Sequence, residues 1–152
     1  MKKKVPKGLA AVAIAAILIP TMVFANEKND LVSPLGVGKW DVLLNSEYGV
    51  YASRWVATRP VNSGGGDLRI CMSGVNTGNT ITVDVFEEDL NFNDTVKTGI
   101  TFKGPSTGTG TSSKTCSANM DVEKYVDGDF AEIFLKMKGK LESDTVRVYI
   151  ED

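Results

Sequence analysis

Apolar and polar side chains alternate with a period of two along most of the chain after residue 39. In residues 80–85, Ile81, Val83 and Val85 alternate with two threonines and an aspartate. Successive side chains of a strand point to opposite faces of its sheet, so this pattern predicts strands with one buried face and one wetter face. Further strands are predicted at residues 40–44, 50–59, 67–73, 100–103, 131–138 and 145–150.

Turn-forming residues separate these runs at short intervals. Gly, Asn, Asp and Ser gather at residues 62–66, 73–78, 127–129 and 139–144. The sequence therefore predicts an all-β fold, an antiparallel β-sandwich or barrel of about seven to eight short strands. The helical signal is weak. Val122, Tyr125 and Val126 have helical spacing after Asp121, which predicts at most one short helical turn.

The first 25 residues have the three parts of a secretory signal peptide. Four lysines precede an unbroken apolar run of 11 residues, and Ala25 is the small residue before a cleavage site between Ala25 and Asn26. The alternative is an uncleaved anchor helix, which needs about 20 apolar residues, and Pro20 interrupts the run.

We therefore expect a signal peptide at residues 1–25, a flexible N-terminal arm at 26–38 and a single domain at 39–152. The expected product is secreted and has no stable membrane anchor. The lysine-rich start of the signal peptide is typical of bacterial proteins.

The net charge of the chain narrows the classes of binding partner that we expect. Four of the 17 basic residues and none of the 19 acidic residues lie in the predicted signal peptide, so the rest of the chain carries a formal net charge of −6. An acidic surface without basic clusters disfavours nucleic acid and anionic membranes. We expect an extracellular protein or glycan as partner. The oligomeric state is left open.

Cys71 and Cys116 are the two cysteines of the chain. In an oxidising compartment they predict one disulfide, which stabilises a 46-residue loop by about 4 kcal/mol at most. The alternative is a reactive or metal-binding thiol pair, but there is no CxxC spacing and no histidine. The pattern leaves open whether the bond lies on the outer face of a sheet or on a strand covered on both sides.

The lack of histidine removes several enzyme classes. Ser-His-Asp and Cys-His catalysis both require it, and the sequence has no GxxxxGK[ST] loop for phosphate. Hydrolysis by a pair of Asp or Glu side chains stays open. We therefore expect a non-catalytic secreted binding module. A small secreted hydrolase and an extracellular structural or matrix protein are the alternatives.

The densest group of chemically active side chains is the acidic segment at residues 87–94, directly after a predicted strand. Glu87, Asp89 and Asp94 supply the hard oxygen ligands that calcium prefers. No other cofactor is expected. The alternative is an acidic turn whose charge keeps the protein soluble.

With Val96, this segment resembles a calcium-binding loop of C2 domains over about ten residues. In that family a strand is followed by two acidic residues separated by a spacer. A third acidic residue, a further spacer and an aliphatic residue come after them. The resemblance implies calcium at Glu87, Asp89 and Asp94, although the first acid is Glu rather than Asp. Such sites also require a second acidic loop. In this sequence Asp127 and Asp129 are the only candidates for it.

Tryptophan and tyrosine side chains suggest a carbohydrate-binding surface by analogy with other secreted β-sandwiches. Trp40 has the spacing to share a face with Val42 and Leu44, which favours the core. Core packing is also the expectation for Trp55. Tyr51 and Trp55 share one side of the predicted 50–59 strand. If that side is exposed, they are the candidate ligand-binding residues.

Overall fold

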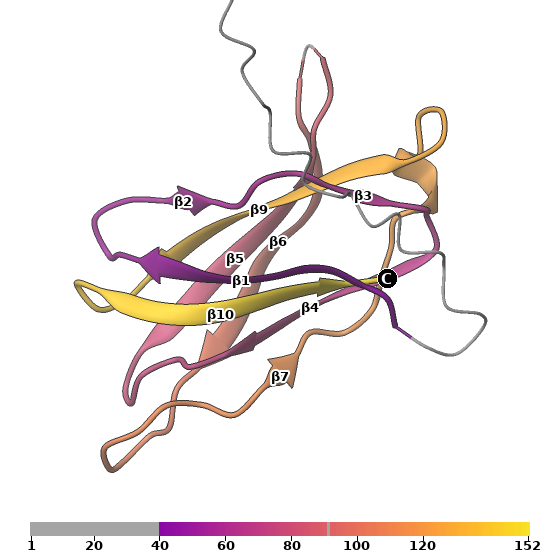
Figure 1. Cartoon of the computed structure of the whole chain (residues 1–152). Helices are drawn as coiled ribbons and strands as arrows, with labels where there is room; N and C mark the ends of the chain where they lie inside the picture. Colours follow the sequence, from indigo (N-terminus) through magenta and orange to yellow (C-terminus); the bar gives the residue numbers. More distant parts are fainter. Residues whose placement is uncertain (1–39, 91) are drawn as a thin grey trace, which may run out of the picture. The chain divides into compact units, whose positions relative to one another are not determined.

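The computed structural model describes residues 40–90 and 92–152. The predicted signal peptide and the predicted N-terminal arm lie outside these residues. The described chain forms these elements (Figure 1): β1 (Val42–Val50), β2 (Val56–Ala57), β3 (Val61–Ser63), β4 (Asp67–Ser73), β5 (Thr80–Glu87), β6 (Asp94–Lys103), β7 (Thr115–Cys116), β8 (Met120–Asp121), η1 (Glu123–Tyr125), β9 (Ala131–Gly139) and β10 (Asp144–Glu151).

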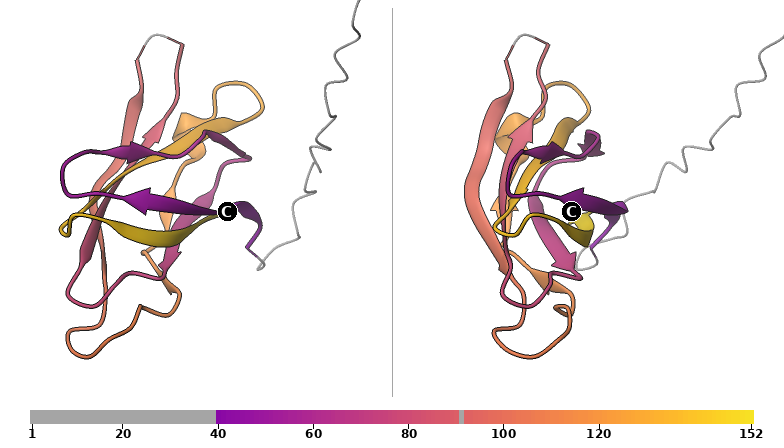
Figure 2. Two further views of the ribbon diagram at one scale, coloured as in Figure 1. Left: turned by 60° about the vertical axis from the view of Figure 1, so that its left-hand side comes forward. Right: turned by 90° about the vertical axis from the view of Figure 1, so that its left-hand side faces the viewer.

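The strands form two antiparallel sheets, which the views of Figure 2 show as two layers. One sheet has the order β1-β10-β4-β7, and β8 follows β7 along the same edge of β4. The other has the order β2-β9-β5-β6, and β3 follows β2 along the same edge of β9. The predicted all-β antiparallel sandwich is confirmed.

The strand order identifies the sandwich as a jelly roll. If β2 with β3 and β7 with β8 are each taken as one interrupted strand, eight strands remain. Their order is first-eighth-third-sixth in one sheet and second-seventh-fourth-fifth in the other. This is the arrangement of a double Greek key, so strands that are distant in sequence become neighbours.

A single hydrophobic core lies between the two sheets. The period-two pattern of the sequence places alternate side chains of each long strand in it, as expected for facing sheets. Its largest fully buried members are Leu44, Val50, Leu68, Ile70, Met72, Val75, Ile81, Val83, Ile133, Leu135, Met137 and Ile150.

The barrel alternative is wrong. Within the described residues no strand pairing joins the two sheets. On one side, edge strand β6 is separated from β8 and η1 by a groove of about 480 Å³. The Tyr125 hydroxyl crosses from η1 to β6 and donates a hydrogen bond to the Thr95 carbonyl (3.0 Å).

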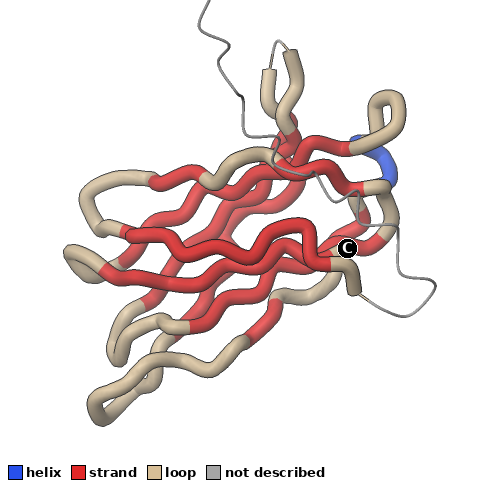
Figure 3. The backbone as a smooth tube through the Cα atoms, viewed as in Figure 1, coloured by secondary structure: helices blue, strands red, loops and turns tan. Residues whose placement is uncertain are grey.

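The short turn expected after Asp121 is present as η1, the blue segment of Figure 3. The Glu123 amide donates to the Asp121 carboxylate (3.0 Å), which holds the start of the turn. In the part of the chain that the structure describes, no helix has the length and apolar character needed to cross a membrane.

The strand predicted at residues 50–59 is wrong. β1 ends at Val50, and β2 contains Val56 and Ala57 alone. The residues between them form a turn, so their period-two alternation does not assign them to faces of a sheet. A second irregularity affects β1, where a register shift lies between Val42 and Leu44. It leaves Val42 45% exposed while Leu44 is buried.

A buried asparagine holds the β9–β10 turn against β5. Asn79 Oδ1 accepts hydrogen bonds from the backbone amides of Thr80, Lys140 and Leu141 (2.8, 3.0 and 3.1 Å). Its Nδ2 donates to Asp144 Oδ2 (2.7 Å). Every polar atom of this amide is therefore used, and the position of the turn depends on it.

Asn79→Ala is expected to lower the free energy of unfolding by about 2–4 kcal/mol, because it removes the acceptor of three amides and a partner of buried Asp144. Urea unfolding monitored by circular dichroism measures the loss. Asn76→Ala is the matched control, since Asn76 is exposed and its effect should stay within about 0.5 kcal/mol. Equal losses in the two variants would contradict this role.

Candidate functional sites

Glu87 is the last residue of β5 and is buried, with 4% of its surface exposed. It follows Ile81, Val83 and Val85 on the core-facing side of the strand. Among the described residues, its Oε1 has no hydrogen-bond partner. Asp89 and Asp94, the two other predicted ligands, are exposed.

The acidic segment lies at one end of the β5–β9 pair. Glu87 is in register with Ile133 of β9, and the Glu88 amide donates to the Glu132 carbonyl (2.7 Å). This pairing brings the connection before β9 to the same end of the sheet. A hollow of about 350 Å³ there is lined by Glu88, Asp89, Leu90, Asp127 and Glu132.

Glu87 faces the core and does not line this hollow, but nearby carboxylates act on it. Burial, and then the negative charges of Asp127, Asp89, Asp94 and Glu132, raise the pKa of the Glu87 carboxyl. Asp127, one of the two residues that the sequence suggested for a second acidic loop, therefore joins the predicted segment. Asp129 does not line the hollow.

Glu132 is a member of this group that sequence reasoning missed. It lies in β9, and the period-two pattern assigned it only to a solvent-facing position. The register of β9 with β5 was the missing information.

Trp55 lies in the turn between β1 and β2, and the expectation that it packs in the core is wrong. Its surface is 46% exposed. It lines a hollow of about 390 Å³ with Thr80, Thr82, Lys138, Gly139 and Lys140. Thr80 and Thr82 alternate with core residues of β5, so the hollow opens on the outer face of the sheet.

Tyr51 lies in the same turn but does not line the hollow. The Arg54 guanidinium lies 4.4 Å from the centroid of its ring. The Tyr51 carbonyl accepts a hydrogen bond from the Gly139 amide (3.1 Å), which attaches the turn to the end of β9. Tyr51 therefore helps to position the turn that carries Trp55.

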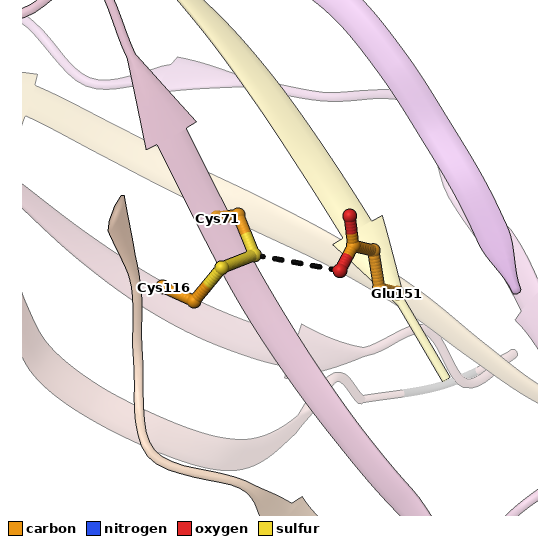
Figure 4. Close-up of side chains that lie close together, drawn as sticks. All are labelled: Cys71, Cys116 and Glu151. Atoms are coloured by element: carbon orange, nitrogen blue, oxygen red, sulfur yellow. Dashed lines mark hydrogen bonds between the residues drawn. A yellow bond between two sulfur atoms is a disulfide. The ribbon is translucent and has the colours of Figure 1, made fainter. Parts of the chain in front are cut away.

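The disulfide Cys71–Cys116 is present and joins β4 to β7. It lies on the outer face of its sheet, because Leu68, Ile70 and Met72 occupy the core side of β4. Cys71 is nevertheless fully buried. Figure 4 shows what lies beside it: Cys71 Sγ is 3.5 Å from Oε2 of Glu151 on β10. A disulfide sulfur has no proton to donate, so we read this as a packing contact.

Glu151 is buried beside the disulfide and is paired with two cations. Arg69 donates from Nε to its Oε2 (2.8 Å), and Lys114 pairs with its Oε1. Each cation also lies over an aromatic ring, Arg69 at 4.1 Å from the Trp40 centroid and Lys114 at 4.2 Å from that of Tyr149. Trp40 is half-buried in this layer, so its predicted place in the core is also wrong.

Within residues 40–90 and 92–152, Cys71, Cys116 and Glu151 are the one group of three potential metal ligands that lie within 4.8 Å of one another. Both sulfurs are used in the disulfide. The group therefore offers a metal a single carboxylate, which is already bonded to Arg69 and Lys114. We assign it a structural role.

A family model described as "YndA coiled coil domain" matches residues 43–150. The chain belongs to this family. The match runs from β1 to β10, so both hollows and the disulfide lie inside it. The described part of this YndA-family domain is two β-sheets with the single turn η1, so the words "coiled coil" do not describe its fold.

Other comparisons add little to the YndA match. No curated protein matches the chain. Among solved structures, one titled "Structure of infectious bursal disease virus Gt strain" is similar, with 8% identity and a TM-score of 0.31. The similarity covers 70% of this chain and 32% of that chain, so the YndA-family chain matches about a third of its length.

Two opposing effects set the acidity of Glu151 in this YndA-family domain. Burial raises the pKa of its carboxyl, but hydrogen bonds and charges from Lys114 and Arg69 outweigh burial and hold it below its ordinary value. The charged form is therefore favoured in the folded state. Its stabilisation is complete above the ordinary glutamate pKa and is lost as the pH falls through the folded-state value.

At pH 7, Glu151→Gln is expected to lower the free energy of unfolding by about 1–3 kcal/mol, because two cations lose their charged partner. The difference from the native protein should shrink as the pH falls below 4.5, the ordinary glutamate value. Urea unfolding at pH 7, 5 and 3 measures it.

Glu47→Gln is the control for this series. Its ion pair with Arg147 is exposed on both sides, so the substitution should change the free energy of unfolding by at most about 1 kcal/mol. A difference for Glu151→Gln that grows on acidification would contradict the direction of the pKa shift.

Proposed function

We propose that the protein is a secreted, non-catalytic binding module whose ligand is a glycan held in the Trp55 hollow. The half-exposed indole carries this proposal. Tryptophan is large and apolar, and a soluble protein gains stability by burying it. A tryptophan kept on the surface beside a hollow is the kind of anchor that dominates binding energy at recognition sites.

The other residues of the Trp55 hollow favour a sugar over an apolar peptide. Thr80 and Thr82 carry hydroxyl groups that both donate and accept hydrogen bonds, and Lys138 and Lys140 carry ammonium donors. A sugar presents an apolar ring face to an indole and hydroxyl groups to such partners. The two ammonium groups also favour sugars that carry carboxylates.

The hollow has a rigid base. Thr80, Thr82 and Lys138 belong to the paired strands β5 and β9, and Asn79 fixes the backbone of Lys140. A preformed site loses little conformational entropy when the ligand binds. This geometry supports recognition, while the expectation that the protein is not an enzyme remains a prediction.

The test uses Trp55 itself as the reporter. The chain has two tryptophans, so Trp40→Phe leaves Trp55 as the single source of indole fluorescence. Titration with chitohexaose, cellohexaose and oligogalacturonate should change the emission of this variant for at least one sugar. That sugar should also protect the indole from acrylamide quenching.

Trp55→Ala should weaken the binding of that sugar at least tenfold by calorimetry, roughly 1.4 kcal/mol. Trp40→Phe is the matched control and should leave the affinity unchanged, because Trp40 lies against Arg69 on the other sheet. Binding that survives Trp55→Ala would contradict the assigned site. No change with any of the three sugars would contradict a glycan ligand and direct the search to protein partners.

A further inference from the structure

Three lysines share the outer face of the sheet on which the Trp55 hollow opens. Lys138 of β9 and Lys140, just beyond the end of that strand, line the hollow. Lys103 ends β6 and is paired with Thr80, which lines the same hollow. Directly opposite residues of an antiparallel pair point to the same face, so Lys103 belongs to this face as well. The expectation of a surface without basic clusters is therefore wrong here.

The three lysines lie on both sides of a strip of threonines. Thr80 and Thr82 of β5 lie between β9 and β6, and Thr101 of β6 is opposite Thr82. The backbones of β9 and β6 are two strand spacings apart, which is about 10 Å. A ligand that pairs with lysines on both sides of the strip therefore needs at least two anionic groups. Between them it meets hydroxyl groups that both donate and accept hydrogen bonds.

Within residues 40–90 and 92–152, no carboxylate forms an ion pair with these lysines. The ion pairs involve Arg69, Lys114 and Arg147, and each of these is bonded to a glutamate of the other sheet. The chain after the predicted signal peptide has a formal net charge of −6, so the lysine-bearing face is a local exception on an acidic protein. Its ammonium groups are available to a ligand of opposite charge.

Acidic groups limit this positive face in the direction of the strands. Further along the β5–β9 pair, Asp84 lies opposite Lys136, whose ammonium is 4.7 Å from the centroid of the Phe86 ring. Beyond them is the acidic hollow at the other end of the same strand pair. Because like charges repel, an anionic chain is favoured across the strands, from Trp55 toward Lys103, and disfavoured along them.

We propose that the ligand of the Trp55 hollow is a polyuronate, a glycan chain with a carboxylate on successive sugars, which crosses the sheet from Trp55 to Lys103. This inference rests on the proposed glycan function and names the class of sugar. The Trp55 indole contacts the face of one sugar ring, and Lys138 and Lys140 pair with the carboxylate of that sugar. Lys103 pairs with the carboxylate of a sugar further along the chain.

The threonines favour carboxylates over sulfate esters as the source of the negative charge. A uronate carries its carboxylate outside the ring and keeps its ring hydroxyls, whereas a sulfate ester is made at a hydroxyl and removes that donor. Thr80, Thr82 and Thr101 need sugar hydroxyls as hydrogen-bond partners.

Calorimetry with hexagalacturonate and its methyl ester tests the role of charge. The two chains have the same sugars, but the ester has no carboxylates. At about 50 mM sodium chloride, the native protein should bind the acid at least about fivefold more tightly than the ester. The preference should fall to about twofold or less at about 500 mM sodium chloride, because salt screens exposed charges.

Lys103→Gln should weaken the binding of hexagalacturonate by about two- to fivefold and leave that of the ester unchanged, since Lys103 lies outside the Trp55 hollow. Lys97→Gln is the matched control. It removes the same charge from the same strand, but Lys97 lines the groove beside η1, so binding should be unchanged. Both lysines are exposed, and neither substitution disturbs the core.

The outcomes separate this inference from the glycan proposal. Equal affinities for the acid and the ester, both lost in Trp55→Ala, would overturn the acidic ligand and leave the glycan site in place. The same follows if chitohexaose or cellohexaose binds and hexagalacturonate does not. Equal effects of Lys103→Gln and Lys97→Gln would overturn the path across the sheet. Dextran sulfate or a single-stranded oligonucleotide that binds as tightly as hexagalacturonate, and without Trp55, would show attraction by charge alone and also overturn the proposal.

Discussion

The register between β5 and β9 is the constraint on which both candidate sites depend. Ile81 lies opposite Gly139 and Glu87 lies opposite Ile133, and the core side chains of both strands pack between the sheets. A shift by one residue would turn every one of these side chains to the other face, so burial fixes the pairing. The same pairing brings Lys138 and Lys140 to one end of β5 and Glu132 to the other.

The two buried glutamates show how the domain distributes charge. Glu151 at the end of β10 lies beside the disulfide and is compensated by Arg69 and Lys114, so it stabilises the fold with no ligand required. At Glu87, at the end of β5, burial and the negative charges of nearby carboxylates both raise the pKa of the carboxyl. The surroundings therefore favour the charged form of Glu151 and disfavour the charged form of Glu87.

Period-two alternation predicted the fold class, much of the core and the strands β4, β5, β9 and β10, because two facing sheets demand it of the sequence. It found only the first part of β1 (Val42–Val50) and the last four residues of β6 (Asp94–Lys103), where few side chains are buried. The disulfide followed from the cysteine count. Alternation failed where the backbone leaves the regular strand: the register shift in β1 separates Val42 from Leu44, and Trp55 lies in a turn. Glu132 and Asp127 come beside Glu88 and Asp89 only through pairing between segments that are distant in sequence, which a local pattern does not contain.

The central claim is that the Trp55 hollow on the outer face of the β5–β9 pair is the ligand-binding site. Amide and indole chemical shifts of the ¹⁵N-labelled protein, recorded with and without a bound oligosaccharide, test it most directly. We predict that the sugar perturbs the Trp55 indole and residues 80–82 and 138–140. Shifts confined to the acidic end of the same strand pair, at residues 87–89 and 127–132, would contradict the claim.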